Sequence, residues 1–99
     1  MQLRWPSRRA EPGVFRRGSH LASVRHGDKV VLMDLDREQF YSLDGVAGRL
    51  WDLLEAPATV DQLTTQLAIE YDAPNEILRR DVAEFLAELE RDGLLQGGR

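Results

Sequence analysis

Histidines and nearby carboxylates are the first side chains to consider for chemistry, because together they can hold a metal ion. The chain has two histidines, His20 and His26. The nearest carboxylates belong to Asp28, Asp34 and Asp36. A site of two histidines and one carboxylate needs its ligands on one face of the chain. Gly27 interrupts any strand that spans both histidines, so surface positions in hairpin turns are favoured. We predict no metal site and no cofactor.

Paired carboxylates could serve as general acid and base. Asp34 and Asp36 flank a predicted turn, and Glu84 and Glu88 are four residues apart on one side of a predicted helix. Glycosidase-type catalysis needs two carboxyls across a cleft, and neither pair offers that. Ser42 has no histidine in a matching strand register, so a hydrolase triad has no support. The glycines form no phosphate-binding loop. By exclusion, we predict that the chain is not an enzyme.

The charge is unevenly distributed along the 99 residues. Residues 1–27 carry six arginines and one glutamate, whereas residues 28–99 carry seven basic and sixteen acidic groups, a net charge of 7 − 16 = −9. A nucleic-acid surface needs clustered lysine and arginine, which the acidic part lacks. The alternative function, a winged-helix protein that binds nucleic acid through residues 76–92, is disfavoured because that segment has a net charge of 3 − 6 = −3.

The lack of cysteine and of long apolar runs in the sequence indicates the cellular compartment that we expect. There is no cysteine, which suits a reducing cytoplasm. The longest apolar runs, such as residues 30–33, are far too short to span a bilayer. We expect a soluble cytoplasmic protein without membrane partners.

Short alternating runs in the first half of the chain predict an antiparallel β-meander. The expected strands span residues 20–25, 29–35 and 38–43. Residues 26–28 form the first turn, where glycine supplies the positive φ of a tight hairpin. Residues 36–37 form the second turn.

After the third strand, the apolar period changes from about 2 to about 3.6 residues, which predicts helices. Asp44 caps the first helix and Pro57 ends it, and Thr59 caps the second. The third helix runs from about residue 76 to residue 91, and residues 94–95 fold back onto its end.

These elements predict one α+β domain in which a three-stranded antiparallel β-meander precedes three α-helices that cover one sheet face. The residues expected in its core are Leu35, Tyr41, Leu43, Leu50, Trp51, Leu54, Leu63, Leu67, Val82, Phe85, Leu86 and Leu89. Residues 19–96 form this domain. Residues 1–18, which are rich in proline, glycine and arginine, form a flexible basic arm, although Trp5 or Phe15 could dock on the domain or an early strand could form near Phe15.

The third strand carries none of the features that usually protect a sheet edge. Residues 38–43 contain no proline and no lysine, so the edge is open to pairing with another extended chain. Strand alternation points Tyr41 and Leu43 to the core, and Phe40 and Ser42 to the opposite face. Pairing of this edge with itself would give a weak homodimer.

The third helix should lie close to that edge, because it closes the core. Ile77, Asp81, Glu84 and Glu88 flank its buried stripe on one side. A groove between the strand and this flank would have an apolar floor and an acidic lip. The alternative is a purely structural role, in which Ile77 extends the core and the acidic side chains are solvated.

The ordered set of motifs resembles the PqqD-like family. The resemblance covers roughly residues 20–95 and is carried by VLMDLDREQFYSLDGVAGRLWDLLEAPATVDQLTTQLAIEYDAP, from residue 31, and ILRRDVAEFLAELERDGLL, from residue 77. Its pieces are Tyr41-Ser42-Leu43-Asp44, Gly48, Trp51-Asp52-Leu53-Leu54, Thr59-Val60-Asp61-Gln62-Leu63, Asp81-Val82, Phe85-Leu86 and Gly93-Leu94-Leu95.

The resemblance implies a winged-helix-like fold and the function of a leader-peptide recognition element, of the stand-alone type found in lasso peptide pathways. Such a protein catalyses nothing. The leader of a ribosomal precursor peptide adds as a strand beside the third strand, packs against the third helix, and is presented to a leader protease and a cyclase. The expected peptide-binding residues are Gln39, Phe40, Tyr41, Ser42, Leu43, Ile77, Asp81, Glu84, Phe85 and Glu88.

Overall fold

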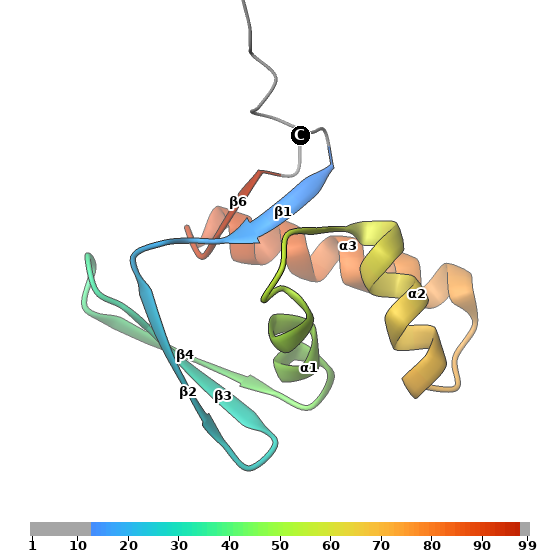
Figure 1. Ribbon diagram of the computed structural model, residues 1–99, viewed down its shortest axis with the longest axis horizontal. Coiled ribbons are helices and arrows are strands. Elements are labelled where there is room, and N and C mark those ends of the chain that lie inside the picture. Colours follow the sequence, from blue (N-terminus) through green and yellow to red (C-terminus); the bar gives the residue numbers. More distant parts are fainter. Residues whose placement is uncertain (1–12, 98–99) are drawn as a thin grey trace, which may run out of the picture.

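The computed structural model describes residues 13–97 as strands and helices arranged around one core (Figure 1). The elements are β1 (Val14–Arg17), β2 (Leu21–His26), β3 (Lys29–Asp34), β4 (Gln39–Asp44), α1 (Val46–Leu53), β5 (Ala58–Thr59), α2 (Val60–Glu70), α3 (Asn75–Arg91) and β6 (Leu95–Gly97). The α+β class, with a three-stranded meander followed by three helices, is confirmed. Its likeness to a winged helix remains a prediction.

The meander consists of β2, β3 and β4 in that order, with antiparallel pairing throughout. His26 pairs with Lys29, so the first hairpin has a two-residue loop, and Gly27 adopts a φ of 67° there. A two-residue hairpin loop needs positive φ, which glycine accepts without steric cost. The predicted strands and their first turn are therefore confirmed to within a residue or two.

The turn between β3 and β4 is organised by one buried carboxylate. Asp34 is fully buried, and its Oδ1 accepts hydrogen bonds of 3.0 Å from the main-chain N–H groups of Asp36 and Arg37. Because β3 ends with Asp34 facing inward, the next residue, Leu35, faces solvent and is 56% exposed. The prediction that Leu35 belongs to the core is therefore wrong.

A second small sheet, not predicted as such, joins the two ends of the described chain. Its order is β5-β1-β6, and all pairs are antiparallel. Phe15 in β1 is buried in the core, which matches the option of an early strand near this residue. Residues 14–17 are thus part of the folded body, although the predicted arm extended to residue 18. Residues 1–12 lie outside the described part of the chain.

The helices follow the predicted segments, with one difference at a cap. Thr59 Oγ1 accepts from the N–H of Gln62 and the Gln62 side chain accepts from the N–H of Thr59, which completes a capping box at α2. The N-cap of α1 is Gly45 rather than the predicted Asp44, and no side chain caps this helix. Leu94 and Leu95 fold back and are buried, as predicted.

The core lies between the inner face of the meander and the three helices. The predicted members that are buried are Leu43, Leu50, Trp51, Leu54, Leu63, Leu67, Val82, Leu86 and Leu89. Tyr41 and Phe85 are partly buried against this cluster. The core also contains Phe15, for which docking was one of the options, and residues that were not predicted, among them Val30, Leu32 and Ala58.

Two further properties concern the described residues only. Between residues 13 and 97, no helix combines the length and the apolar character needed to cross a bilayer. The same residues contain no group of three or more histidine, cysteine, aspartate or glutamate side chains placed to hold a metal ion.

Candidate peptide-binding edge and pocket

β4 is an edge strand of the meander, since within residues 13–97 it pairs with β3 alone. The direction of its main-chain groups follows from the ladder pattern. The N–H of Leu35 donates to the carbonyl of His20 at 3.1 Å, so the odd-numbered residues of β3 bond to β2. In an antiparallel ladder successive residues bond to alternate sides. The even-numbered residues of β3 therefore bond to β4.

The same alternation assigns the free groups of β4. Asp34 pairs with Gln39, Leu32 with Tyr41, and Val30 with Leu43, so the odd-numbered residues of β4 bond to β3. The N–H and C=O groups of Phe40 and Ser42 consequently point away from the sheet, towards the open edge. These are the groups that a further strand would use.

The side chains of β4 divide between two faces, as predicted. Leu43 is buried and Tyr41 is partly buried, whereas Phe40 is 67% exposed and Ser42 is exposed. Gln39 Oε1 accepts a 2.9 Å hydrogen bond from the Tyr41 hydroxyl. Tyr41 and Leu43 therefore fix the strand to the core and leave Phe40 on the outer face of the sheet.

The ends of β4 are flanked by two features that involve α3. Before β4 begins, Arg37 Nη1 donates to the main-chain oxygen of Asp92, the residue after α3. After β4 ends, Val46 of α1 lines a pocket together with Asp81 of α3. No residue of β4 lines this pocket, which is linked to the strand through Val46, two residues after β4 ends.

This pocket is apolar and lies where the three helices meet. It has a volume of about 330 Å³. Its lining comprises Val46, Ala47, Leu50, Leu67, Leu78, Asp81, Val82 and Phe85. Of the predicted site residues it contains Asp81 and Phe85. Val46, Ala47 and Leu78 were not among the predicted site residues, and their apolar character within the helical segments was the available signal. Their position where α1 and α3 diverge could not be read from the sequence.

The other predicted residues of α3 do not line the pocket. Ile77 is 44% exposed, and the carboxylates of Glu84 and Glu88 are exposed. Ile77 therefore does not extend the core, contrary to the structural alternative considered for this residue. Asp81 lies at the pocket, 3.9 Å from Arg80 Nε, and supplies an acidic group at its rim.

Comparisons with known proteins identify a family and a relative of this chain. Residues 29–95 match the family described as Coenzyme PQQ synthesis protein D (PqqD). A relative named PqqA binding protein, from Gluconobacter oxydans (strain 621H), is 32% identical over 81 residues, which is 82% of each chain.

Two solved structures share the fold. One, described as TbiB1 in complex with the TbiA(beta) leader peptide, matches with a TM-score of 0.79 and 29% identity, over 83% of this chain and 95% of that chain. The other, described as lasso peptide synthetase B1 complexed with the leader peptide, has a TM-score of 0.73 and 20% identity, over 83% and 96%. At that identity the second likeness concerns the fold alone.

The fold and the family match place the chain in the class of PqqD-like recognition elements. Because the family match covers most of the chain, the assignment does not depend on any one motif. The chain belongs to the PqqD family.

Proposed function

We propose that this protein captures the leader region of a ribosomal precursor peptide by adding it as a strand to β4. The observation that carries the proposal is the open β4 edge beside an apolar pocket. The PqqD family match and the similar structure of TbiB1, described as a complex with a leader peptide, support it.

Strand addition uses the free main-chain groups of the edge. Phe40 and Ser42 each offer one N–H and one C=O to a guest strand. Each hydrogen bond so formed contributes about 0.5–1.5 kcal/mol net. Such bonds hold any extended peptide, so the affinity is general and the sequence preference must come from side-chain contacts.

The pocket supplies that preference. A volume of about 330 Å³ accepts one or two apolar side chains. Asp81 at its rim favours a polar or basic group next to the apolar residue and disfavours a second carboxylate. Phe85, partly buried against the core, provides an aromatic wall. The leader would therefore alternate residues that enter this pocket with residues that join the outer face near Phe40.

The protein acts as a non-catalytic carrier in this proposal. It holds the leader while a separate leader protease and a cyclase of a lasso-type pathway process the precursor. A nucleic-acid-binding function is disfavoured by the negative charge of residues 76–92.

The test is a binding titration with a fluorescently labelled leader peptide, for which the TbiA(beta) leader is the probe. Replacing Ser42→Pro removes an outward N–H, and we expect it to weaken leader binding by more than about 1 kcal/mol. Ser42→Ala, which keeps that N–H, should bind the leader like the parent protein.

A matched control lies on the opposite edge. Ser23 in β2 is also exposed, and the ladder pattern also directs its N–H outward. Ser23→Pro should therefore leave leader affinity unchanged. Equal leader affinity in a folded Ser42→Pro variant would refute the assignment to β4. A dimer that dissociates when leader is added, measured by sizing, would instead indicate that this edge pairs with itself in the free protein.

A further inference from the structure

The meander has a second open edge, formed by β2. Among residues 13–97, β2 pairs with β3 alone. Its even-numbered residues bond to β3, so the N–H and C=O groups of Leu21, Ser23 and Arg25 point outward. The side chains of Ser23 and Arg25 lie on the sheet face that α1 covers, because their partners on β3, Leu32 and Val30, are buried.

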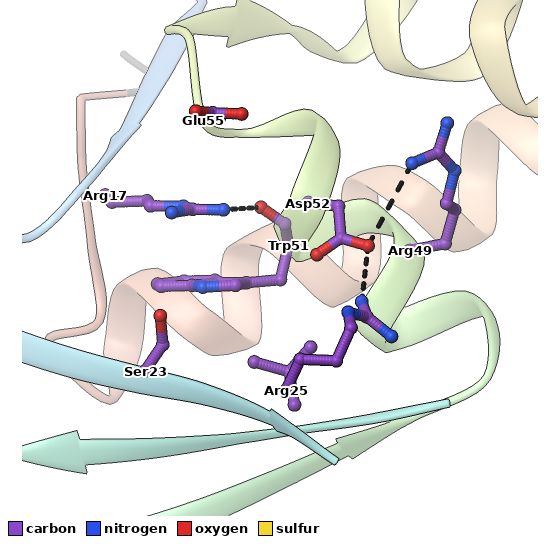
Figure 2. Close-up of a pocket in the computed structure, with 8 residues that line it drawn as sticks. Arg17, Ser23, Arg25, Arg49, Trp51, Asp52 and Glu55 are labelled. Carbon is purple, nitrogen blue, oxygen red and sulfur yellow. Dashed lines mark hydrogen bonds and ion pairs between the residues drawn. The ribbon is translucent and has the colours of Figure 1, made fainter. Parts of the chain in front are cut away.

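A recess of about 480 Å³ lies between this edge and α1 (Figure 2). Three arginines line it: Arg17 from β1, Arg25 from β2 and Arg49 from α1. Two carboxylates, Asp52 and Glu55, also line it. The lining thus has a net charge of 3 − 2 = +1, whereas the whole chain carries −4. We call this site the arginine recess.

One carboxylate of the arginine recess, that of Asp52, lies between two arginines. Arg25 Nη2 bonds to Asp52 Oδ2, and Arg49 Nη1 lies 3.9 Å from the same oxygen. Arg49 also forms a two-pronged pair with Glu70, at 2.7 and 2.8 Å. Asp52 and Glu70 together therefore compensate Arg25 and Arg49, so Arg17 is the cation of the recess that could attract a further anion.

Of the three arginines, Arg17 has the weakest interactions with carboxylates. Its Nη2 donates to the main-chain oxygen of Trp51, and its guanidinium carbon lies 4.7 Å from the centre of the Trp51 ring. It forms no ion pair within residues 13–97, and its buried Nε has no acceptor there. Burial lowers the pKa of Arg17, while the more distant Glu55 and Asp52 raise it. A partly desolvated cation without a close counter-ion is costly, so an incoming carboxylate would be stabilised.

Trp51 provides a second unpaired donor in the same wall. It is only 2% exposed, and its indole N–H has no hydrogen-bond acceptor in the described structure. Figure 2 shows the indole between Arg17 on one side and Ser23 on the other. The exposed Ser23 connects this wall to the edge of β2.

We propose that the arginine recess and the β2 edge together bind an acidic, extended segment of a second polypeptide. The segment would bond to the outward main-chain groups of Ser23 and Arg25. Because side chains alternate along a strand, every second residue would face the recess. Glutamate or aspartate at those positions would place carboxylates beside Arg17 and Arg25, where charge-assisted hydrogen bonds form.

The two edges of the meander differ in charge. The β4 edge has the acidic Asp81 at its pocket, whereas the β2 edge has the arginine recess. β3 separates them, so one molecule could hold a leader peptide at β4 and an acidic partner at β2 without competition. The inference about β2 does not depend on how the leader binds.

The probe is a blocked peptide of alternating glutamate and valine, compared with the same peptide carrying glutamine for glutamate. The readout is the ¹H–¹⁵N spectrum of the full-length protein, in which the indole N–H of Trp51 reports on the recess. The Trp5→Phe variant assigns the two indole signals. We expect the glutamate peptide to shift the Trp51 signal and the neighbouring β2 amides. The glutamine peptide should bind at least about tenfold more weakly.

Variants locate the site. Arg17→Gln should weaken binding of the glutamate peptide at least about tenfold. Arg16→Gln, on the neighbouring exposed residue of β1, should leave that binding unchanged. Should Arg17→Gln fail to fold, Arg25→Gln carries the same test, because its side chain is exposed. Ser23→Pro should weaken binding of the glutamate peptide and leave leader binding unchanged. Ser42→Pro should weaken leader binding and leave binding of the glutamate peptide unchanged.

Three results would overturn the proposal. The first is equal binding of the glutamate and glutamine peptides. The second is a set of shifted signals confined to β4 and α3. The third is movement of the Trp51 indole signal by Glu11→Gln without peptide, which would show that the chain's own carboxylate fills the recess. Failure of the leader to bind, with the glutamate peptide still held at β2, would count against the proposed function and leave this inference intact.

Discussion

Arg37 Nη1 donates a 3.2 Å hydrogen bond to the main-chain oxygen of Asp92, which joins the turn before β4 to the residue after α3. The guanidinium also packs over Gly93, where an added Cβ would lie 3.4 Å from two of its nitrogens. Since β4 and α3 both contribute to the proposed peptide site, this contact links the segments next to them at one end. Arg37 thus acts on the site without lying in it.

Arg37→Gln should weaken leader binding by about 0.5–1.5 kcal/mol, the usual net contribution of one hydrogen bond. The shorter side chain should not reach Asp92, so the groove walls would be less fixed and ordering them would oppose binding. Calorimetric titration with the leader measures the effect. Arg91→Gln, on an exposed residue of the same helix end, is the control. A loss of the same size in both variants would attribute the effect to overall charge.

Val46→Glu should weaken leader binding by about 1–3 kcal/mol, because it places a charge in an apolar pocket that the leader must cover. Val46 is exposed in the free protein, so the free energy of unfolding should change by less than about 0.5 kcal/mol. Ile69→Glu is the matched control, since Ile69 is an exposed apolar residue of α2 outside the pocket. Leader titration and chemical denaturation of both variants check this. Unchanged leader affinity in Val46→Glu would exclude the pocket from the binding site.

Asp34 should contribute stability that disappears in acid. Burial raises the pKa of Asp34, but the main-chain N–H groups of Arg37 and Asp36, with His20 and Arg37 nearby, lower it below its ordinary value overall. A carboxyl with a lowered pKa in the folded chain stabilises it above the ordinary pKa of about 4. That stabilisation is lost as the pH falls through the lower, folded-state value.

Asp34→Asn keeps an acceptor for the turn but removes the charge. We expect it to lower the thermal midpoint at neutral pH and to approach the parent protein as the pH falls below about 4. Thermal midpoints of the variant and the parent protein, measured by circular dichroism between neutral and acidic pH, give this difference in stability. Asp36→Asn, an exposed residue of the same turn, serves as the control. A difference that stays constant over the whole pH range would show that the charge of Asp34 is not responsible.

Leu32→Ala should destabilise the fold by about 2–5 kcal/mol, because Leu32 is fully buried and its truncation leaves a cavity. Leu35→Ala, only three residues later, should change the stability by less than about 0.5 kcal/mol. Denaturant unfolding of both variants tests the alternation that places Asp34 inward and Leu35 outward. Comparable losses in the two variants would mean that Leu35 is buried after all.

The meander and the three helices could be predicted because their signals are local. Alternation over residues 20–43 and the helical stripes after residue 44 each lie within one element. The buried side of β4 followed from the same alternation, so the positions of Tyr41 and Leu43 were predictable. Leu35 was misassigned because Asp34, and not the apolar Leu35, continues the inward positions of Val30 and Leu32, and a buried carboxylate was not expected there.

The small sheet and the arginine recess depend on contacts between distant residues. β5 consists of two residues, Ala58 and Thr59, which carry no strand signal and become a strand only by pairing with β1. The stacking of Arg17 on Trp51 joins residues 34 positions apart. Composition and periodicity do not report such pairs, so the basic segment around Arg17 resembled a solvated arm.

The closing of the small sheet has a practical consequence for circular permutation. Gly97 pairs with Phe15 and has a φ of 93°, and a Cβ there would lie 2.1 Å from the carbonyl oxygen of Val14. Only glycine fits, and the first and last described strands are thereby held side by side (Figure 1). A short linker between residues 13 and 97 could join them, and the exposed hairpin at Gly27-Asp28 offers a place to open new termini.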